Sequence, residues 1–169
     1  REIAENAGLE CAHNKDSQDI CFIPDGDYAS FIEENSPSVP PCGNYISEDG
    51  CVLGKHRGHH RTTLGQGKGL GIALGKRVYV IDKNASDNTV TLGSEDRLYK
   101  KRVTADSINI ICPGALEKRE RFSAKIRYGR RENTGYAERT GEDTLTFEFD
   151  EAVRAPSPGQ SLVIYDGDC

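Results

Sequence analysis

Apolar residues in the first 40 positions recur at helical spacing. Residues 1–9 place their apolar side chains on one face and stop at Gly8, which predicts the end of an amphipathic helix. A second short helix is predicted to begin after Asp27, whose side chain suits an N-cap. Its apolar face consists of Tyr28, Phe31 and Ile32. Because so short a helix is not stable alone in water, we expect the first one to belong to a larger body.

Beyond a proline-rich segment the pattern changes to the two-residue period of β-strands. The prolines of residues 36–41 exclude a helix or a central strand there and predict a linker. Alternation then predicts strands at 51–53, 77–82 and 88–92. The turn residues of 84–87 predict a hairpin between the last two.

The last third of the chain has the pattern of a small all-β domain. Candidate strands cover 107–111, 122–128, 144–149 and 161–165, separated by glycine, proline and acidic turns. Short strands at this spacing predict a small barrel.

These patterns predict a mainly β chain in three parts. Residues 1–38 are expected to be the tail of a preceding domain, 39–105 a central β-rich domain, and 106–169 a C-terminal barrel that is truncated. No apolar run approaches the length of a membrane span, so we expect a soluble protein without a membrane partner.

Charge is distributed unevenly along the chain. The net charge is −5, yet residues 54–139 hold 19 basic and nine acidic residues, a net +10 between two acidic ends. Such asymmetry is typical of a surface that faces phosphate, although a mixed-charge solvated surface gives the same count.

The six cysteines do not form a recognisable framework. They lie at positions 11, 21, 42, 51, 112 and 169 without a C-x-x-C pair, which favours scattered reduced thiols. A metal site is a less favoured alternative, because zinc ligands usually come in close pairs. Its ligands would be Cys42, Cys51, His56, His59 and His60.

Cys21 is the candidate reactive thiol. It follows a polar, acid-flanked turn and lies within an apolar run, Ile20 to Ile23. One interpretation is a buried core cysteine, and the other is a thiol at the edge of a pocket. The residues alone leave both open.

A glycine-rich segment at 65–71 and a basic strand end at 125–131 are candidate anion-binding elements. The first has four glycines but lacks the G-x-x-x-x-G-K-[ST] spacing of a phosphate loop, so we interpret it as a loop that approaches a partner closely, with Lys68 and Arg61 supplying charge. In the second, Arg127 beside Tyr128 offers a phosphate fork next to a stacking face. The alternative is an exposed basic strand end.

Five separated blocks give the chain a family resemblance. Lys15-Asp-Ser-x-x-Ile-Cys21-Phe-Ile resembles the signature around the sulfur-carrying cysteine of the tRNA-specific 2-thiouridylase family. The other blocks follow in the family's order over nearly all of the 169 residues. They lie at 1–9, 54–71, 125–128 and 158–161.

The resemblance implies a function and a fold. It implies sulfur transfer from a persulfide on Cys21 to C2 of the wobble uridine, after activation by ATP with magnesium, and a second cysteine that resolves the intermediate as a disulfide. It implies tRNA contacts at Arg127, Tyr128 and Gln160, and adds Lys68 and His56 as candidates. The implied fold is the end of an α/β catalytic domain, a central domain and a six-stranded barrel like those of translation factors.

The resemblance also implies partners and a context. These are tRNA and a cysteine desulfurase or sulfur-relay protein, in a cytoplasmic monomer. The family's ATP loop is not in this sequence, so we expect a fragment that binds no ATP or metal and is inactive alone. Relatives carry Arg where this chain has Gly67, and an aromatic residue at Arg61. An RNA-binding barrel module without catalysis is the alternative function.

Overall fold

The computed structural model describes residues 2–13, 22–23, 26–111, 116, 118–129 and 132–167. It forms two compact units, 1–39 and 40–169, each of which is described by itself.

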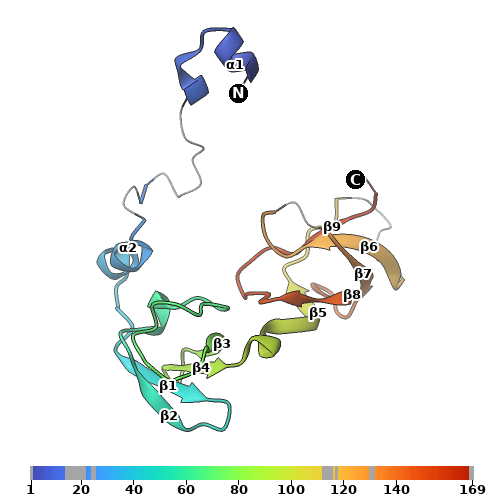
Figure 1. Cartoon of the computed structure of the whole chain (residues 1–169). Helices are drawn as coiled ribbons and strands as arrows, with labels where there is room; N and C mark the ends of the chain where they lie inside the picture. Colours follow the sequence, from blue (N-terminus) through green and yellow to red (C-terminus); the bar gives the residue numbers. More distant parts are fainter. Residues whose placement is uncertain are drawn as a thin grey trace. The chain divides into compact units, whose positions relative to one another are not determined.

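The first unit contains short helices (Figure 1). The α2 helix begins as predicted, because Asp27 accepts a hydrogen bond from the Ser30 backbone N–H at 3.0 Å. Its Phe31 ring packs against Phe22 with 5.4 Å between ring centroids. The elements are α1 (Glu2–Asn6), η1 (Glu10–His13) and α2 (Tyr28–Asn35).

The central sheet has four strands in the order β2-β1-β4-β3, with β1 and β4 parallel and the other pairs antiparallel. Tyr45, Val80, Val90 and Leu92 form its buried core. The predicted hairpin is confirmed, and the Asn84 side chain accepts from two backbone N–H groups in its turn. The strands are β1 (Gly43–Ser47), β2 (Val52–His56), β3 (Tyr79–Asn84) and β4 (Thr89–Gly93).

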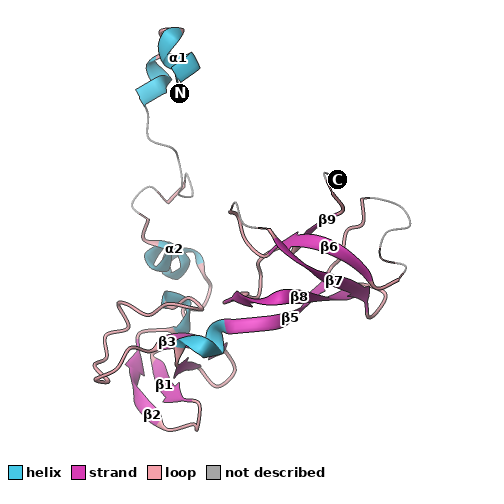
Figure 2. Ribbon diagram, turned by 45° about the vertical axis from the view of Figure 1, so that its right-hand side comes forward, coloured by secondary structure: helices cyan, strands magenta, loops and turns pink. Residues whose placement is uncertain are grey.

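The C-terminal sheet is antiparallel throughout, in the order β5-β8-β7-β6-β9 (Figure 2). Phe147 and Phe149 lie at its centre, fully buried with 4.6 Å between their ring centroids. The described residues form five strands, where the resemblance implied six. These are β5 (Tyr99–Asp106), β6 (Glu120–Lys125), β7 (Asn133–Arg139), β8 (Thr144–Arg154) and β9 (Val163–Tyr165).

The strand predicted at 107–111 is wrong. The chain pairs through β5 instead and leaves the sheet at Ser107, where the backbone φ is +55°. The next N–H, of Ile108, donates to the Asp143 side chain at 2.9 Å, and Ile111 is 86% exposed. Apolar composition therefore identified the segment after the edge strand rather than the strand itself.

A small apolar cluster joins the two sheets of the second unit. Tyr79 of β3, Leu98 at the end of η3 (Glu95–Leu98) and Ala155 after β8 are buried together. The Ala155 N–H donates to the Leu98 carbonyl at 2.7 Å. This cluster fixes the end of β8 against the central sheet.

Candidate nucleic-acid interface

The connection between β6 and β7 presents Tyr128 to solvent. The Tyr128 side chain is 107% exposed, and it lies in the turn at residues 126–129. An exposed tyrosine ring offers a face on which an unpaired nucleobase stacks. The structure thus places Tyr128 where a base can reach it.

Arg127 has backbone partners within the barrel. Its Nη2 donates to the carbonyl oxygen of Arg154, and to that of Ala155 at 3.4 Å. One nitrogen of the guanidinium is therefore hydrogen-bonded at the C-terminal end of β8 and is not available for a bidentate phosphate contact.

Gln160 lies in an exposed turn close to the same carbonyl. Its backbone N–H donates to the Ser157 carbonyl at 3.2 Å, and Gly159 supplies the positive φ of +79° that the turn requires. The Ser157 hydroxyl donates to the Ala155 carbonyl at 3.2 Å. Arg127 and the Gln160 turn therefore meet at one carbonyl oxygen.

The glycine-rich loop is held in place before Lys68. The Gly65 N–H donates to the Val80 carbonyl at 2.8 Å, and the Val80 N–H donates to the Gln66 carbonyl at 2.9 Å. The Gln66 side chain then donates to the Lys68 carbonyl at 2.9 Å. The Lys68 side chain is exposed, and no described acidic residue pairs with it.

Gly67 lies against the Tyr79 ring. A Cβ added at Gly67 would come within 2.8 Å of two ring carbons and 3.3 Å of the Val78 carbonyl oxygen. Two cations flank the same ring, with Arg77 at 5.3 Å and Arg154 at 5.6 Å from its centroid. Any side chain at position 67 would therefore meet the Tyr79 ring in this chain.

An open hollow lies beside the glycine-rich loop. It has a volume of about 420 Å³ and is lined by residues 67, 69–74 and 76–78. Leu70, Ile72 and Leu74 supply apolar walls, and Lys76 and Arg77 supply positive charge. No Walker-type phosphate cradle is formed by these residues, because the sequence spacing that such a cradle requires is missing.

His56 is buried, with only 3% of its surface exposed. Its Nδ1 accepts a hydrogen bond from the Gly58 N–H at 3.0 Å, so Nε2 carries the proton and donates to the Asn88 carbonyl at 3.3 Å. Both ring nitrogens therefore bond the protein's own backbone. In this conformation His56 orders the loop after β2 and has no exposed edge for RNA.

The surroundings of His56 favour its neutral form. Burial is the main cause that lowers the pKa of His56, and the hydrogen bond to the Asn88 carbonyl opposes it. Three positive or titratable neighbours lower the pKa further: His59, His60 and Lys83.

The proposed zinc ligands are not gathered. Cys42 and Cys51 are exposed free thiols, and His59 Nδ1 lies 3.3 Å from the Asn88 side-chain oxygen. Over the part of the chain that the structure describes, no three His, Cys, Asp or Glu residues could share a metal ion.

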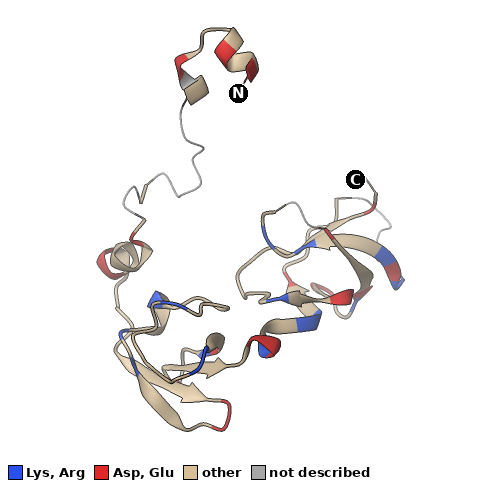
Figure 3. Cartoon of the chain, viewed as in Figure 1, with Lys and Arg blue, Asp and Glu red and all other residues tan. Residues whose placement is uncertain are grey.

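Several basic residues of the barrel form ion pairs. Figure 3 shows where basic and acidic positions lie along its strands. Arg119 pairs with Glu148 at 3.0 Å, and Arg121 pairs with Asp150 at 2.7 Å. Both guanidinium groups also lie over the Tyr136 ring, an arrangement that sequence reasoning missed because it did not identify β7 as a strand.

Lys125 is the basic strand-end residue that finds an acidic partner. It pairs with Glu132 at 2.9 Å, and this hydrogen-bonded pair raises the pKa of Lys125 and lowers the pKa of Glu132. The count of net +10 already includes Glu132, whereas Glu148 and Asp150, the partners of Arg119 and Arg121, lie outside residues 54–139 and offset part of that charge.

The predicted site residue Cys21 falls outside the described part of the chain, as do Arg130 and Arg131 of the predicted basic strand end. Among the helices that are described, none has the length and apolar composition needed to cross a membrane.

The comparisons with known proteins cover both sheets. Residues 29–94 match the family model of the tRNA methyl transferase PRC-barrel domain, and residues 100–169 match that of the aminomethyltransferase beta-barrel domain. Together they include Lys68 and His56 in the first match and Arg127, Tyr128 and Gln160 in the second.

Similar curated proteins share one printed function. The tRNA-specific 2-thiouridylase MnmA of Clostridioides difficile is 44% identical over 168 residues, which is 99% of this chain and 46% of the relative. That of Acetivibrio thermocellus is 45% identical, with 99% and 47% covered. MnmA 2 of Clostridium botulinum strain Loch Maree is 43% identical, with 99% and 48% covered.

The chain spans about half the length of these curated relatives. The identity nevertheless extends over almost all of the chain and includes the region around Cys21 as well as both sheets. The chain belongs to the tRNA-specific 2-thiouridylase family.

Proposed function

We propose that the chain is the tRNA-binding and sulfur-carrying part of a tRNA-uridine 2-sulfurtransferase. The observation that carries the proposal is the joint position of Tyr128 and the Gln160 turn at one end of the barrel. Arg127 and Ser157 bind the same carbonyl there, in a chain 44% identical to a named tRNA-specific 2-thiouridylase.

Recognition of the RNA rests on stacking and on phosphate contacts. Tyr128 stacks an unpaired base, and the exposed Gln160 side chain supplies hydrogen bonds to the nucleotide beside it. Lys68 on the glycine-rich loop supplies a positive charge to the backbone of the same tRNA. His56 orders the backbone at Gly58, directly after β2, rather than contacting RNA itself.

Cys21 is the sulfur carrier in this proposal. The terminal sulfur of its persulfide attacks C2 of the activated wobble uridine, and the C2 oxygen leaves with the activating group. A second cysteine thiolate then attacks Cys21 Sγ, breaks the Sγ–S bond and leaves sulfur on C2. The resulting protein disulfide accepts two electrons from a thiol reductant before the next turnover.

ATP does not fit the described residues of this chain. The glycine-rich loop lacks a phosphate cradle, and the hollow beside it has apolar walls. We therefore place activation by ATP and magnesium in another part of the intact enzyme. A cysteine desulfurase or sulfur-relay protein loads Cys21, in a cytoplasmic monomer.

The test uses the intact enzyme and quantifies 2-thiouridine in tRNA nucleosides by mass spectrometry. Cys21→Ser should abolish the product and leave tRNA affinity within about threefold, because the thiol carries sulfur without gripping RNA. Cys11→Ser is the matched control and should retain activity. Normal thiolation by Cys21→Ser together with loss in Cys11→Ser would overturn the assignment.

A binding module without catalysis is the second candidate, favoured by the exposed Tyr128 alone. In that case Cys21 is a buried core residue and reacts slowly with iodoacetamide under native conditions. Rapid alkylation of Cys21, followed by peptide mass mapping, supports the sulfur carrier instead.

A further inference from the structure

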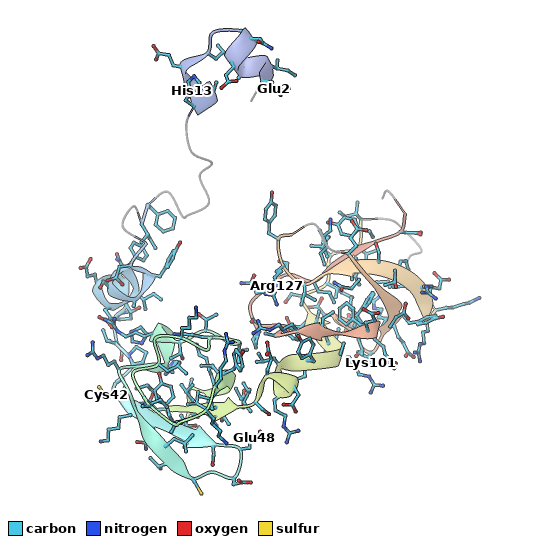
Figure 4. The ribbon with its side chains drawn as sticks, in the orientation of Figure 1. Glu2, His13, Cys42, Glu48, Lys101 and Arg127 are labelled. Carbon is cyan, nitrogen blue, oxygen red and sulfur yellow. The ribbon has the colours of Figure 1, made fainter. Side chains whose placement is uncertain are left out.

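Arg127 lies between two elements that the proposed function assigns to tRNA. It lies two residues after the end of β6 and precedes Tyr128, and its guanidinium reaches the C-terminal end of β8 (Figure 4). Nη2 donates to the carbonyls of Arg154 and Ala155. The bonds therefore cross from the β6–β7 hairpin to the segment that leads into the Gln160 turn.

The carbonyl of Ala155 is shared by both elements. It accepts from Arg127 Nη2 at 3.4 Å and from the Ser157 hydroxyl at 3.2 Å. Ser157 in turn accepts the Gln160 N–H at 3.2 Å. A change in the direction of this carbonyl would move the hairpin and the turn together.

Ala155 is itself a fixed point. Its φ is +50°, a conformation that is uncommon for a residue with a side chain, and it is only 8% exposed. Its N–H is held by the Leu98 carbonyl at 2.7 Å. A Cβ at Gly65 would lie 3.2 Å from the Ala155 Cβ, so the glycine-rich loop begins against the same residue.

We propose that Arg127 is a positioning residue for tRNA recognition rather than a phosphate ligand. Its guanidinium ties the hairpin that presents Tyr128 to the carbonyl that orients the Gln160 turn. Both bonds come from Nη2, and a bidentate phosphate contact would compete for this same nitrogen. The inference rests on the proposed function, because Tyr128 must contact RNA for its position to affect binding.

A double-mutant cycle on tRNA affinity tests the role. Arg127→Ala and Tyr128→Ala should each weaken binding by about tenfold, and the double variant should lose little more than either single variant. The losses should not add, because Tyr128 contributes little to tRNA binding once the Arg127 hydrogen bonds that position it are lost. Additive losses would overturn the positioning role.

Salt dependence distinguishes the two roles of Arg127 independently. A lost phosphate contact lowers the slope of log K against log salt by about 0.7 to 0.9, whereas a lost brace leaves the slope unchanged. Arg127→Lys, which keeps the charge, should weaken binding at unchanged slope because the lysine side chain is one bond shorter and its ammonium does not reach the position of Nη2. Wild-type affinity in Arg127→Lys would contradict the proposal.

Arg139→Ala is the matched control. Arg139 also donates to two backbone carbonyls, those of Gly141 at 3.1 Å and of Glu142, but it lies at the opposite end of β7. Its removal deletes one charge and the same kind of bond, and it should leave tRNA affinity within about twofold. A loss equal to that of Arg127→Ala would mean that the effect is general destabilisation.

A fluorescent reporter tests, without RNA, whether Arg127 restricts the motion of the side chain at position 128. The chain contains no tryptophan, so Tyr128→Trp introduces a single probe on the hairpin. Adding Arg127→Ala should lower the fluorescence anisotropy of this probe, and Arg139→Ala should not. Unchanged anisotropy would overturn the positioning role. If Tyr128→Ala alone leaves tRNA affinity unchanged, the proposed tRNA surface fails instead.

Discussion

The central sheet buries the motif residue His56, whereas the C-terminal sheet exposes the motif residues Tyr128 and Gln160. In the central sheet, both ring nitrogens of His56 bond backbone groups of the protein. In the C-terminal sheet, Tyr128 and Gln160 are exposed. A residue in a family motif is therefore not by that fact a contact residue. Burial separates those that order a loop from those that a partner can reach.

Both sheets nevertheless depend on a small number of core side chains, and this predicts the largest effects. Phe147→Ala removes a fully buried ring from the C-terminal core and should lower the free energy of unfolding by about 3–5 kcal/mol. Val90→Ala, the counterpart in the central core, removes fewer atoms and should cost about 2 kcal/mol. Urea unfolding followed by circular dichroism measures both, and a smaller loss for Phe147→Ala would show that the C-terminal core collapses around the gap.

Gly67 tests whether the central sheet is packed as closely as the structure indicates. Gly67→Ala should destabilise the chain by about 1–3 kcal/mol, because the new Cβ would meet the Tyr79 ring at 2.8 Å. Gly129→Ala is the matched control in the barrel hairpin, where no heavy atom lies within 4 Å of the added Cβ.

The same packing predicts that Tyr79→Leu in the Gly67→Ala background recovers part of the lost stability. Equal unfolding midpoints for Gly67→Ala and the wild type would instead show that the Tyr79 ring moves aside freely. The family's arginine at position 67 would then be tolerated by this chain.

Local signals in the sequence were sufficient for part of this comparison. Asp27 is the N-cap of α2, and the turn at 84–87 does join β3 and β4, because each depends on bonds between residues close in sequence. Strand β7 was not predicted, since its pattern includes Gly135 and two charged residues. Gly135 is required by the neighbouring strand, where an added Cβ would lie 2.2 Å from the Glu148 carbonyl oxygen.

The candidate site was predictable to a similar extent. Tyr128 was expected at the end of a strand over 122–128, whereas β6 ends at Lys125 and Tyr128 is exposed in the connection that follows. The partners of Arg127 come from 27 and 28 residues further along the chain. No local pattern indicates such a contact. The same applies to His56, which the sequence suggested as an RNA ligand. In the structure its Nε2 is hydrogen-bonded to the carbonyl of Asn88, 32 residues away. Cys21 stays a prediction, since it lies outside the described residues.

Tyr128 tests the role of the exposed motif residues of the C-terminal sheet. Tyr128→Ala should weaken tRNA binding by about 1–3 kcal/mol without changing the salt slope, because stacking involves no released counterions. Tyr99→Ala, which alters a 45% exposed tyrosine on the edge strand β5, is the control and should have little effect. Filter binding at several salt concentrations measures affinity and slope together. Equal losses for the two variants would mean that the barrel surface binds RNA without a particular stacking position.

The smallest expected effect concerns the central sheet, whose stability should depend on the protonation of the buried His56. Since burial lowers the pKa of His56 below the ordinary value of 6.5, the unfolded chain binds a proton at a higher pH than the folded chain does. Stability from this group is complete above pH 6.5 and falls as the pH decreases from there through the folded pKa. Protonation of Nδ1 would also break the hydrogen bond that Nδ1 accepts from the Gly58 N–H, because two N–H groups would then face each other.

His56→Gln should therefore lose part of the difference in unfolding free energy between pH 7.5 and pH 5.5, although the variant is less stable than the wild type at both. His13→Gln is the control, because His13 is exposed in the first unit and its removal should leave the difference intact. The comparison uses urea unfolding at the two pH values for each variant. A His56→Gln variant that retains the whole pH dependence would assign that dependence to other groups near the loop, and the central sheet would then not owe its acid sensitivity to the buried imidazole.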